Sequence, residues 1–122
     1  MAPAIVHFLV GASLVLFVLA PLALVSARVR ERRLSAVAVG GLWGLVPDFH
    51  NVSPVYSDEL ESCHGSPRAD LFAAHYTLDR PLVRELSVES TAASILLFLI
   101  AVTVFGVFCG IGRHRDKEAE TN

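Results

Sequence analysis

Histidine and aspartate residues are the side chains of this 122-residue sequence that could do chemistry. His7 lies near the start of the chain, and Asp48 and His50 stand two residues apart directly after an apolar segment. His75 comes later, in a more polar region. Neutral imidazole nitrogens and carboxylate oxygens are ligands for zinc, manganese or iron. A metal held by three or four of them, with one position open, would activate a bound water for hydrolysis. The candidate metal ligands are therefore His7, Asp48, His50 and His75.

A second group of candidate ligands lies in the same polar region and comprises His64, Asp70 and Asp79. His75 and Asp79 are four residues apart, which is one turn of a helix. Asp79 could therefore bind a metal itself, or accept a hydrogen bond from the ring nitrogen of His75 that does not bind the metal. The fifth histidine, His114, stands in a basic tail, where we expect it to be solvated.

The elements that carry these residues are predicted to be membrane helices. Hydrophobic residues make up 53% of the chain and the mean hydropathy is +0.55, which is above the usual range of soluble domains. The uncharged runs 4–27 and 91–112 each exceed the ~20 residues that a helix needs to cross a bilayer. A third apolar run, 34–47, is shorter. We predict an all-α protein with a single membrane domain over residues 1–122 and three transmembrane helices, the second one short.

Basic residues predict the orientation of these helices. Four arginines lie within residues 28–33, after the first apolar run, and three more basic residues lie in the tail 113–122. Both groups should stay in the cytoplasm, so the amino terminus would be outside the cell membrane and the carboxyl terminus inside. A cleaved signal would carry its basic residues before the apolar run, which predicts a retained anchor here. If residues 34–47 were re-entrant, the basic tail would lie outside, so the charge distribution favours three spans.

The outer loop, residues 48–90, is acidic and is predicted to contain one amphipathic helix. Eight acidic residues against three arginines give this loop a net charge of −5. Ser66 followed by Pro67 is a typical helix start. A helix from there to Asp79 would place Leu71, Ala74, His75 and Leu78 on one face. This face should lie on the membrane surface or against the other helices.

Two pairs of glycines have the spacing that lets membrane helices approach closely. Gly40 and Gly44 form a small-xxx-small step in the short segment, and Gly106 and Gly110 form another in the last span. We expect close helix packing at Gly40 and Gly44, where Gly41 adds a third small residue.

A family resemblance rests on the early histidine followed by Gly11, and on the short glycine-rich segment that ends in Val46-Pro47-Asp48-Phe49-His50. With the later histidine-bearing loop, these features resemble the YdjM-like membrane-bound metal-dependent hydrolases over about residues 4–80. The resemblance implies a small helical membrane protein in which the early histidine, Asp48 and His50 are metal ligands. The family's later motif, a histidine-arginine pair followed by Thr-His-Ser, has no clean match here.

Two functions are compatible with these observations. The first is a metal-dependent hydrolase with a His/Asp site at the outer membrane face, acting on a phosphoester or lipid-derived substrate. The alternative is a non-enzymatic membrane protein whose histidines and acids form a structural or cation-binding patch. A transporter is less favoured, because only Ser13, Ser94 and Thr103 are polar near the centres of the long spans. The expected partners are the lipid bilayer and a membrane protein or second copy, and a net charge of −2 gives no reason to expect nucleic acid.

Overall fold

A computed structural model describes residues 3–51 and 55–121, and this part of the chain consists of helices joined by short turns, with no strand. The prediction of an all-α protein is confirmed. In chain order the elements are α1 (Ala4–Ala23), α2 (Ala27–Glu31), α3 (Arg33–Leu45), the 3-10 helix η1 (Val46–Asn51), α4 (Ser57–His64), the 3-10 helix η2 (Pro67–Leu71), α5 (His75–Leu78), α6 (Pro81–Glu85) and α7 (Ser87–Thr121).

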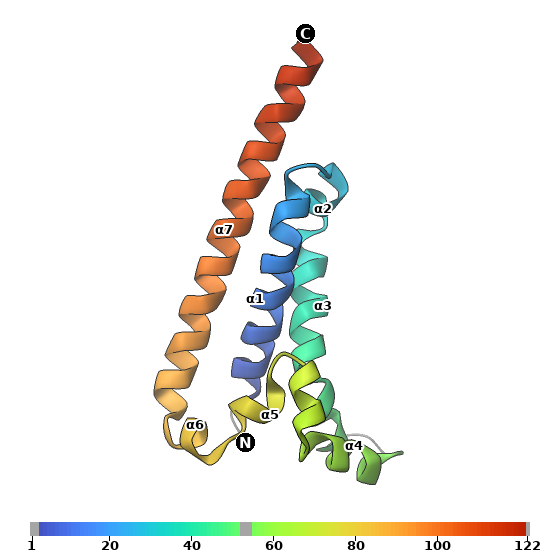
Figure 1. Cartoon of the computed structure of the whole chain (residues 1–122), viewed down its shortest axis with the longest axis vertical. Helices are drawn as coiled ribbons and strands as arrows, with labels where there is room; N and C mark the ends of the chain where they lie inside the picture. The colour runs from blue at the N-terminus through green and yellow to red at the C-terminus, as the bar shows by residue number, and fades with distance from the viewer. Residues whose placement is uncertain (1–2, 52–54, 122) are drawn as a thin grey trace.

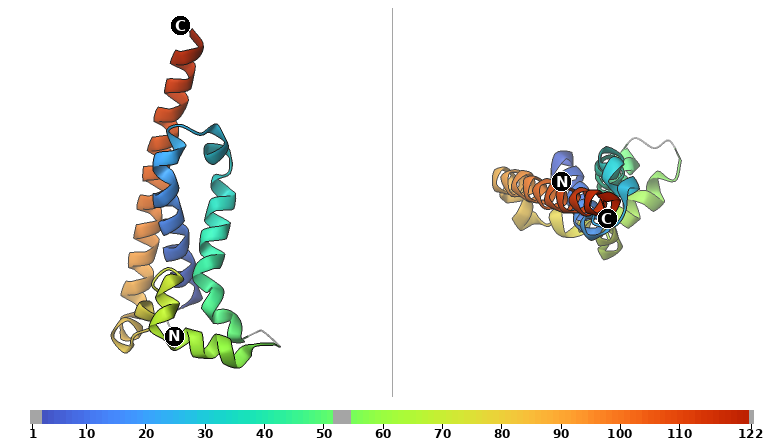
Figure 2. Two further views of the ribbon diagram at one scale, coloured as in Figure 1. Left: turned by 45° about the vertical axis from the view of Figure 1, so that its right-hand side comes forward. Right: turned by 90° about the horizontal axis from the view of Figure 1, so that it is seen from above.

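The long helices form an elongated bundle in which α3 and α7 both pack against α1 (Figure 1). The short helices α4, α5 and α6 gather near the amino terminus at one end, and α2 lies toward the other end, beyond which α7 projects (Figures 1 and 2). The apolar core lies between α1 and α7 and contains Leu16, Ala20, Ala23, Ala101, Phe105 and Cys109. The fold thus separates a loop end, with the short helices, from an arginine end, with α2.

Two helices are long and apolar enough to cross a membrane, namely α1 with 20 residues and α7 with 35. The expected third span is not among them, because the 13 residues of α3 rise only ~20 Å against a hydrocarbon core of ~30 Å. In the most apolar 18-residue stretch of each helix, only 39% of the residues of α1 and 22% of those of α7 are buried. Helices in the core of a soluble protein would be mostly buried, so this exposure favours a lipid environment.

The boundaries of the last helix also differ from the sequence prediction. Pro81 begins the separate short helix α6, and Leu86 divides it from α7. α7 then starts at Ser87 rather than at residue 91 and continues through the tail to Thr121. Its 35 residues measure ~52 Å, so the helix is longer than a bilayer core is thick.

Close packing of α3 on α1 depends on glycine, as predicted. A Cβ on Gly44 would lie 2.2 Å from the carbonyl oxygen of His7, and one on Gly40 would lie 2.7 Å from the carbonyl oxygen of Gly11. Any larger residue would therefore push the two backbones apart. A Cβ on Gly106 or Gly110, by contrast, would have no atom within 4 Å, so the second glycine pair makes no such contact within the described chain.

The amphipathic helix predicted over residues 66–79 is wrong. Pro67 does begin a helix, but it is the short η2, and the chain then reverses at Ala73 and Ala74, which adopt left-handed φ angles of 58° and 59°. The Asp70 carboxylate accepts hydrogen bonds from the backbone N–H of Thr77 at 2.7 Å and from its hydroxyl at 2.8 Å. These bonds offset the ~1–2 kcal/mol that each left-handed residue costs, and they fix the turn that precedes His75.

Candidate metal centre

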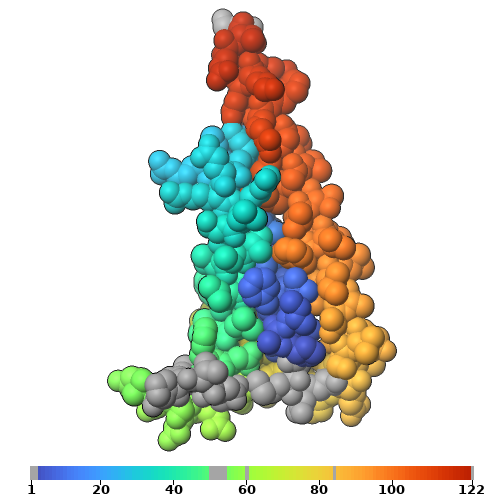
Figure 3. All heavy atoms as spheres, turned by 180° about the vertical axis from the view of Figure 1, so that it is seen from behind, coloured from blue at the N-terminus to red at the C-terminus, as the bar shows by residue number. Residues whose placement is uncertain are grey.

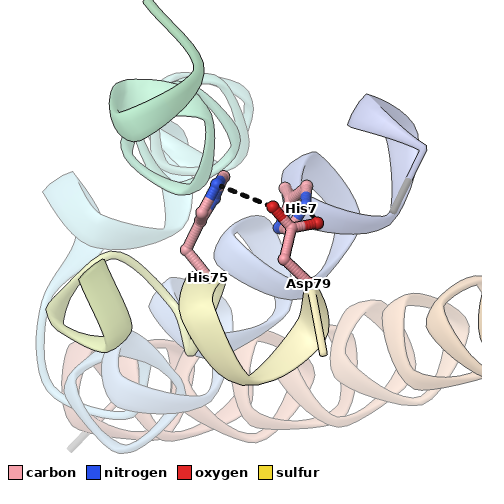
Figure 4. Close-up of side chains that lie close together, drawn as sticks. All are labelled: His7, His75 and Asp79. Carbon is pink, nitrogen blue, oxygen red and sulfur yellow. Dashed lines mark ion pairs between the residues drawn. The ribbon is translucent and has the colours of Figure 1, made fainter. Parts of the chain in front are cut away.

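Five histidine and aspartate side chains converge at the loop end of the bundle. They come from separate elements, and they are His7 on α1, Asp48 on η1, His64 at the end of α4, His75 at the start of α5, and Asp79 just after α5. Figure 4 shows His7, His75 and Asp79 turned toward one another from α1 and α5. The glycine-mediated approach of α3 to α1 and the reversal before α5 together make this convergence possible.

His75 is the central residue, and its side chain is fully buried. Its Nδ1 lies 3.1 Å from the carbonyl oxygen of Gly44. Because a carbonyl oxygen can only accept a hydrogen bond, Nδ1 must carry the proton. In the neutral ring Nε2 therefore presents a lone pair, which is the tautomer that a metal-binding histidine needs.

The Nε2 lone pair of His75 faces other groups that carry lone pairs. It lies 3.4 Å from Oδ1 of Asp48 and 3.7 Å from Oδ2 of Asp79. Ionised carboxylate oxygens are acceptors only, so their approach to this nitrogen requires a positive charge nearby. That charge can be a bound cation, a second proton on His75 itself, or a proton on His64, whose Nδ1 lies 3.1 Å from Nε2 of His75.

His7 adds a second buried imidazole. Its ring stacks on that of His75 with centroids 3.9 Å apart, and the residue is 1% exposed. Its Nε2 lies 3.4 Å from Oδ1 of Asp79, but neither ring nitrogen makes a hydrogen bond within the described residues. Leaving such a group unsatisfied costs about 1–3 kcal/mol, so a ligand bound by His7 would remove this penalty.

His64 covers the outer side of the cluster. Its Nε2 lies 3.2 Å from Oδ2 of Asp79, and its Nδ1 lies 3.7 Å from Oδ1 of Asp48. The side chains of Asp48, His64 and Asp79 are 18%, 17% and 12% exposed, whereas those of His7 and His75 are fully buried. The cluster therefore has a closed side against the helices and a side that water can reach.

Two sets of three side chains have the spacing of a metal site. The first set is His7, His75 and Asp79, and the second set is Asp48, His64 and His75. In each set, one ligand atom from every residue lies within 4.8 Å of the ligand atoms of the other two. His75 belongs to both sets, yet only its Nε2 is available, because Nδ1 binds Gly44. The arrangement therefore suits one ion with a choice of donors rather than two ions.

Three of the four leading candidates from the sequence lie together in the structure, namely His7, Asp48 and His75. The ring of His75 stacks on that of His7, and its Nε2 lies near the carboxylate of Asp48. The side chain of the fourth, His50, lies outside the described residues. From the second group, His64 and Asp79 belong to the cluster. Asp70 does not, because its carboxylate is bound to Thr77.

His114 lies far along α7 from these residues and its side chain is 75% exposed, beside Glu118, as its position in the basic tail predicts. Sequence reasoning placed His64 and Asp79 in the second group of candidates, and the structure brings both into the cluster. The four-residue spacing from His75 was a signal for Asp79, whereas nothing near His64 in the sequence pointed to the site.

Comparison with known proteins finds no matching family model, no matching curated protein and no matching solved structure.

Proposed function

We propose that the protein is an integral membrane protein that binds one divalent transition-metal ion, zinc, manganese or iron, at this His/Asp cluster. The observation that carries the proposal is the orientation of His75. Gly44 fixes the proton on Nδ1, and the Nε2 lone pair meets two carboxylates, Asp48 and Asp79. A divalent cation among these atoms and His7 would balance their charge and satisfy the buried imidazole.

The membrane location and orientation are supported by the separation of the two ends. The arginines of residues 28–33 and the basic tail lie at the end opposite the cluster (Figure 1). The positive-inside rule then puts the arginine end in the cytoplasm and the cluster outside. In this proposal α3 serves as a short third span, held against α1 by its glycines.

Cysteine labelling tests this orientation. In a background lacking Cys63 and Cys109, Asp58→Cys should react with a membrane-impermeant maleimide from outside, and Glu118→Cys only from inside. Both positions are exposed. Reaction of both from the same side would contradict the three-span arrangement.

Metal binding is tested by equilibrium dialysis of detergent-purified protein carrying no polyhistidine tag against Zn²⁺, Mn²⁺ and Fe²⁺, followed by elemental analysis. Wild type should retain one ion per chain. His75→Ala should retain less than a tenth as much, since it loses the central donor, whereas His114→Ala should match wild type. Equal retention by wild type and His75→Ala would show that His75 does not hold an ion and would contradict the proposed site.

A second candidate function is metal-dependent hydrolysis, and the number of donors favours it. Five side chains meet where a catalytic zinc needs three, and the Asp48, His64 and Asp79 side is open to water. A carboxylate not bound to the ion could then act as general base toward a metal-bound water. The test is hydrolysis of bis-p-nitrophenyl phosphate by the metal-loaded protein. Turnover that needs the metal and disappears in Asp48→Asn would support the enzyme, and metal binding without turnover would support a cation-binding role.

A further inference from the structure

Two cavities adjoin at the arginine end of the bundle, away from the His/Asp cluster. The first is polar, about 350 Å³ in volume, and lined by Ala27, Arg30, Glu31, Arg33 and Arg113. The second is apolar, about 300 Å³, and is lined chiefly by Leu16, Leu34, Val37, Phe98, Val102 and Phe105. Arg33 and Arg113 line both cavities, so one amphipathic ligand could occupy the two together.

The charge of the polar cavity favours an anion. Arg30 is already engaged, since its guanidinium donates to the Asp116 carboxylate and to the carbonyl oxygen of Ala23. Arg33 and Arg113 form no ion pair with any residue of the described chain and are exposed. Glu31 is the one carboxylate among the described residues that line this cavity, so the arginines outnumber it. Two unengaged guanidinium groups facing one space are suited to a phosphate.

The apolar cavity has the position and extent of a lipid chain. Along α7 its lining runs from Phe98 to Arg113, which is ~22 Å of helix and more than half of a ~30 Å hydrocarbon core. Leu34 is 78% exposed and Val102 44% exposed, so the groove opens sideways toward the surroundings of the bundle. Figure 3 shows this face, with the teal start of α3 beside the orange part of α7.

We propose that these adjoining cavities bind one membrane lipid with an anionic phosphate headgroup. The phosphate would lie between Arg33 and Arg113, and one hydrocarbon chain would lie in the apolar groove along α7. Charge complementarity selects this occupant, because a zwitterionic lipid would bring an ammonium group toward the arginines. The site is independent of the metal centre and uses none of its residues.

Native mass spectrometry in detergent tests the proposal with phosphatidylglycerol and phosphatidylcholine of identical chains. Wild type should retain one phosphatidylglycerol per chain and prefer it to phosphatidylcholine. Removing both charges by Arg33→Gln with Arg113→Gln should lower this preference about 25-fold, since each basic group near an anionic lipid is worth roughly fivefold. Arg115→Gln with Lys117→Gln removes the same charge outside the cavities and should change little.

A second pair of variants tests the groove with the arginines intact. A side chain at Gly106, which lines the apolar cavity, would enter space where no atom lies within 4 Å, so Gly106→Phe should fold and displace the lipid chain. Gly110 has equally open surroundings but does not line the groove, so Gly110→Phe should keep the lipid.

The proposal is overturned by equal retention of both lipids in wild type, or by an equal loss of preference in the Arg33/Arg113 and Arg115/Lys117 double variants. A wild-type dimer that Gly106→Phe converts to a lipid-free monomer would also overturn it, and would identify a second copy of the chain as the occupant of the groove. Circular dichroism of each variant verifies that the helices persist.

Discussion

Each end of the bundle buries a titratable side chain, but the two side chains differ in their hydrogen bonds. At the arginine end, Arg30 is 8% exposed and is bound by the Asp116 carboxylate and by the carbonyl oxygen of Ala23 at 2.8 Å. At the loop end, His7 is 1% exposed and neither of its ring nitrogens is hydrogen-bonded within the described residues. A buried polar group that is fully partnered stabilises the fold, whereas one left without a hydrogen bond carries a cost that a bound ligand could remove.

The neighbours of each group strengthen this contrast. Arg30 is a donor that meets acceptors, and it ties α2 to the last turn of α1 and to α7. Around His75, by contrast, a nitrogen lone pair meets the oxygens of Asp48 and Asp79. The arginine end is therefore complementary by itself, whereas the loop end would become complementary with the added positive charge that we propose a metal ion supplies.

The largest expected effect comes from His7→Phe, which keeps an aromatic ring stacked on His75 but removes both nitrogens. If His7 is a metal ligand, the zinc dissociation constant should rise about 100-fold. Without metal, the variant should melt at the same temperature as wild type or at a higher one, because an unsatisfied buried polar group is removed. Zinc titration against a chromophoric chelator and thermal melts measure the two quantities. If the variant is less stable than wild type without metal and binds zinc equally well, His7 has a structural role like that of Arg30.

The next effect compares the two glycine steps. Gly44→Ala should destabilise the protein by about 1–3 kcal/mol, because the new methyl would meet the His7 carbonyl oxygen. Gly110→Ala adds the same methyl in open space and should be neutral or stabilising by up to about 1 kcal/mol, since alanine is the better helix former. Thermal denaturation in one detergent compares the variants. A loss at Gly110 as large as at Gly44 would indicate that the second step also packs against a protein surface.

Arg30→Met tests the arginine end directly. The variant keeps much of the side-chain volume but leaves the Ala23 carbonyl and the Asp116 carboxylate without their donor, so we expect a loss of about 1–2 kcal/mol in unfolding free energy. Zinc affinity should not change, because Arg30 belongs to the other end. Parallel measurements of melting and zinc titration separate the effects, and a weakened zinc site would show that the two ends are coupled.

The smallest effect is expected at Asp70, which we infer to be a positioning residue for His75. Asp70→Ala removes both hydrogen bonds to Thr77 and should loosen the turn at Ala73 and Ala74, which lowers zinc affinity about tenfold. Asp70→Asn keeps an acceptor oxygen and should restore most of the affinity. Asp58→Ala, at an exposed acid of the same loop, is the control. Equal affinity in Asp70→Ala and wild type would show that α5 holds His75 without this turn.

Several features of the fold could be predicted from the sequence because they depend on local patterns. Uncharged runs predicted α1 and α7, and the spacing of Gly40 and Gly44 predicted the close approach of α3 to α1. The helix over residues 66–79 could not be excluded in this way. Ala73 and Ala74 are good helix formers, and the turn that places them in left-handed conformations is fixed by the hydrogen bonds between the Asp70 carboxylate and Thr77.

The sequence by itself determined which residues could bind a metal, and it put His7, Asp48 and His75 in one group through their side-chain chemistry and the shared end of the predicted spans. Only the tertiary structure decided that His64 and Asp79 complete this group and that Asp70 does not. The physical reason is that the cluster is assembled from α1, η1, α4 and α5, whose relative positions depend on backbone contacts at glycine and on one loop reversal. Such contacts join residues far apart in the chain, and no periodicity along the sequence records them.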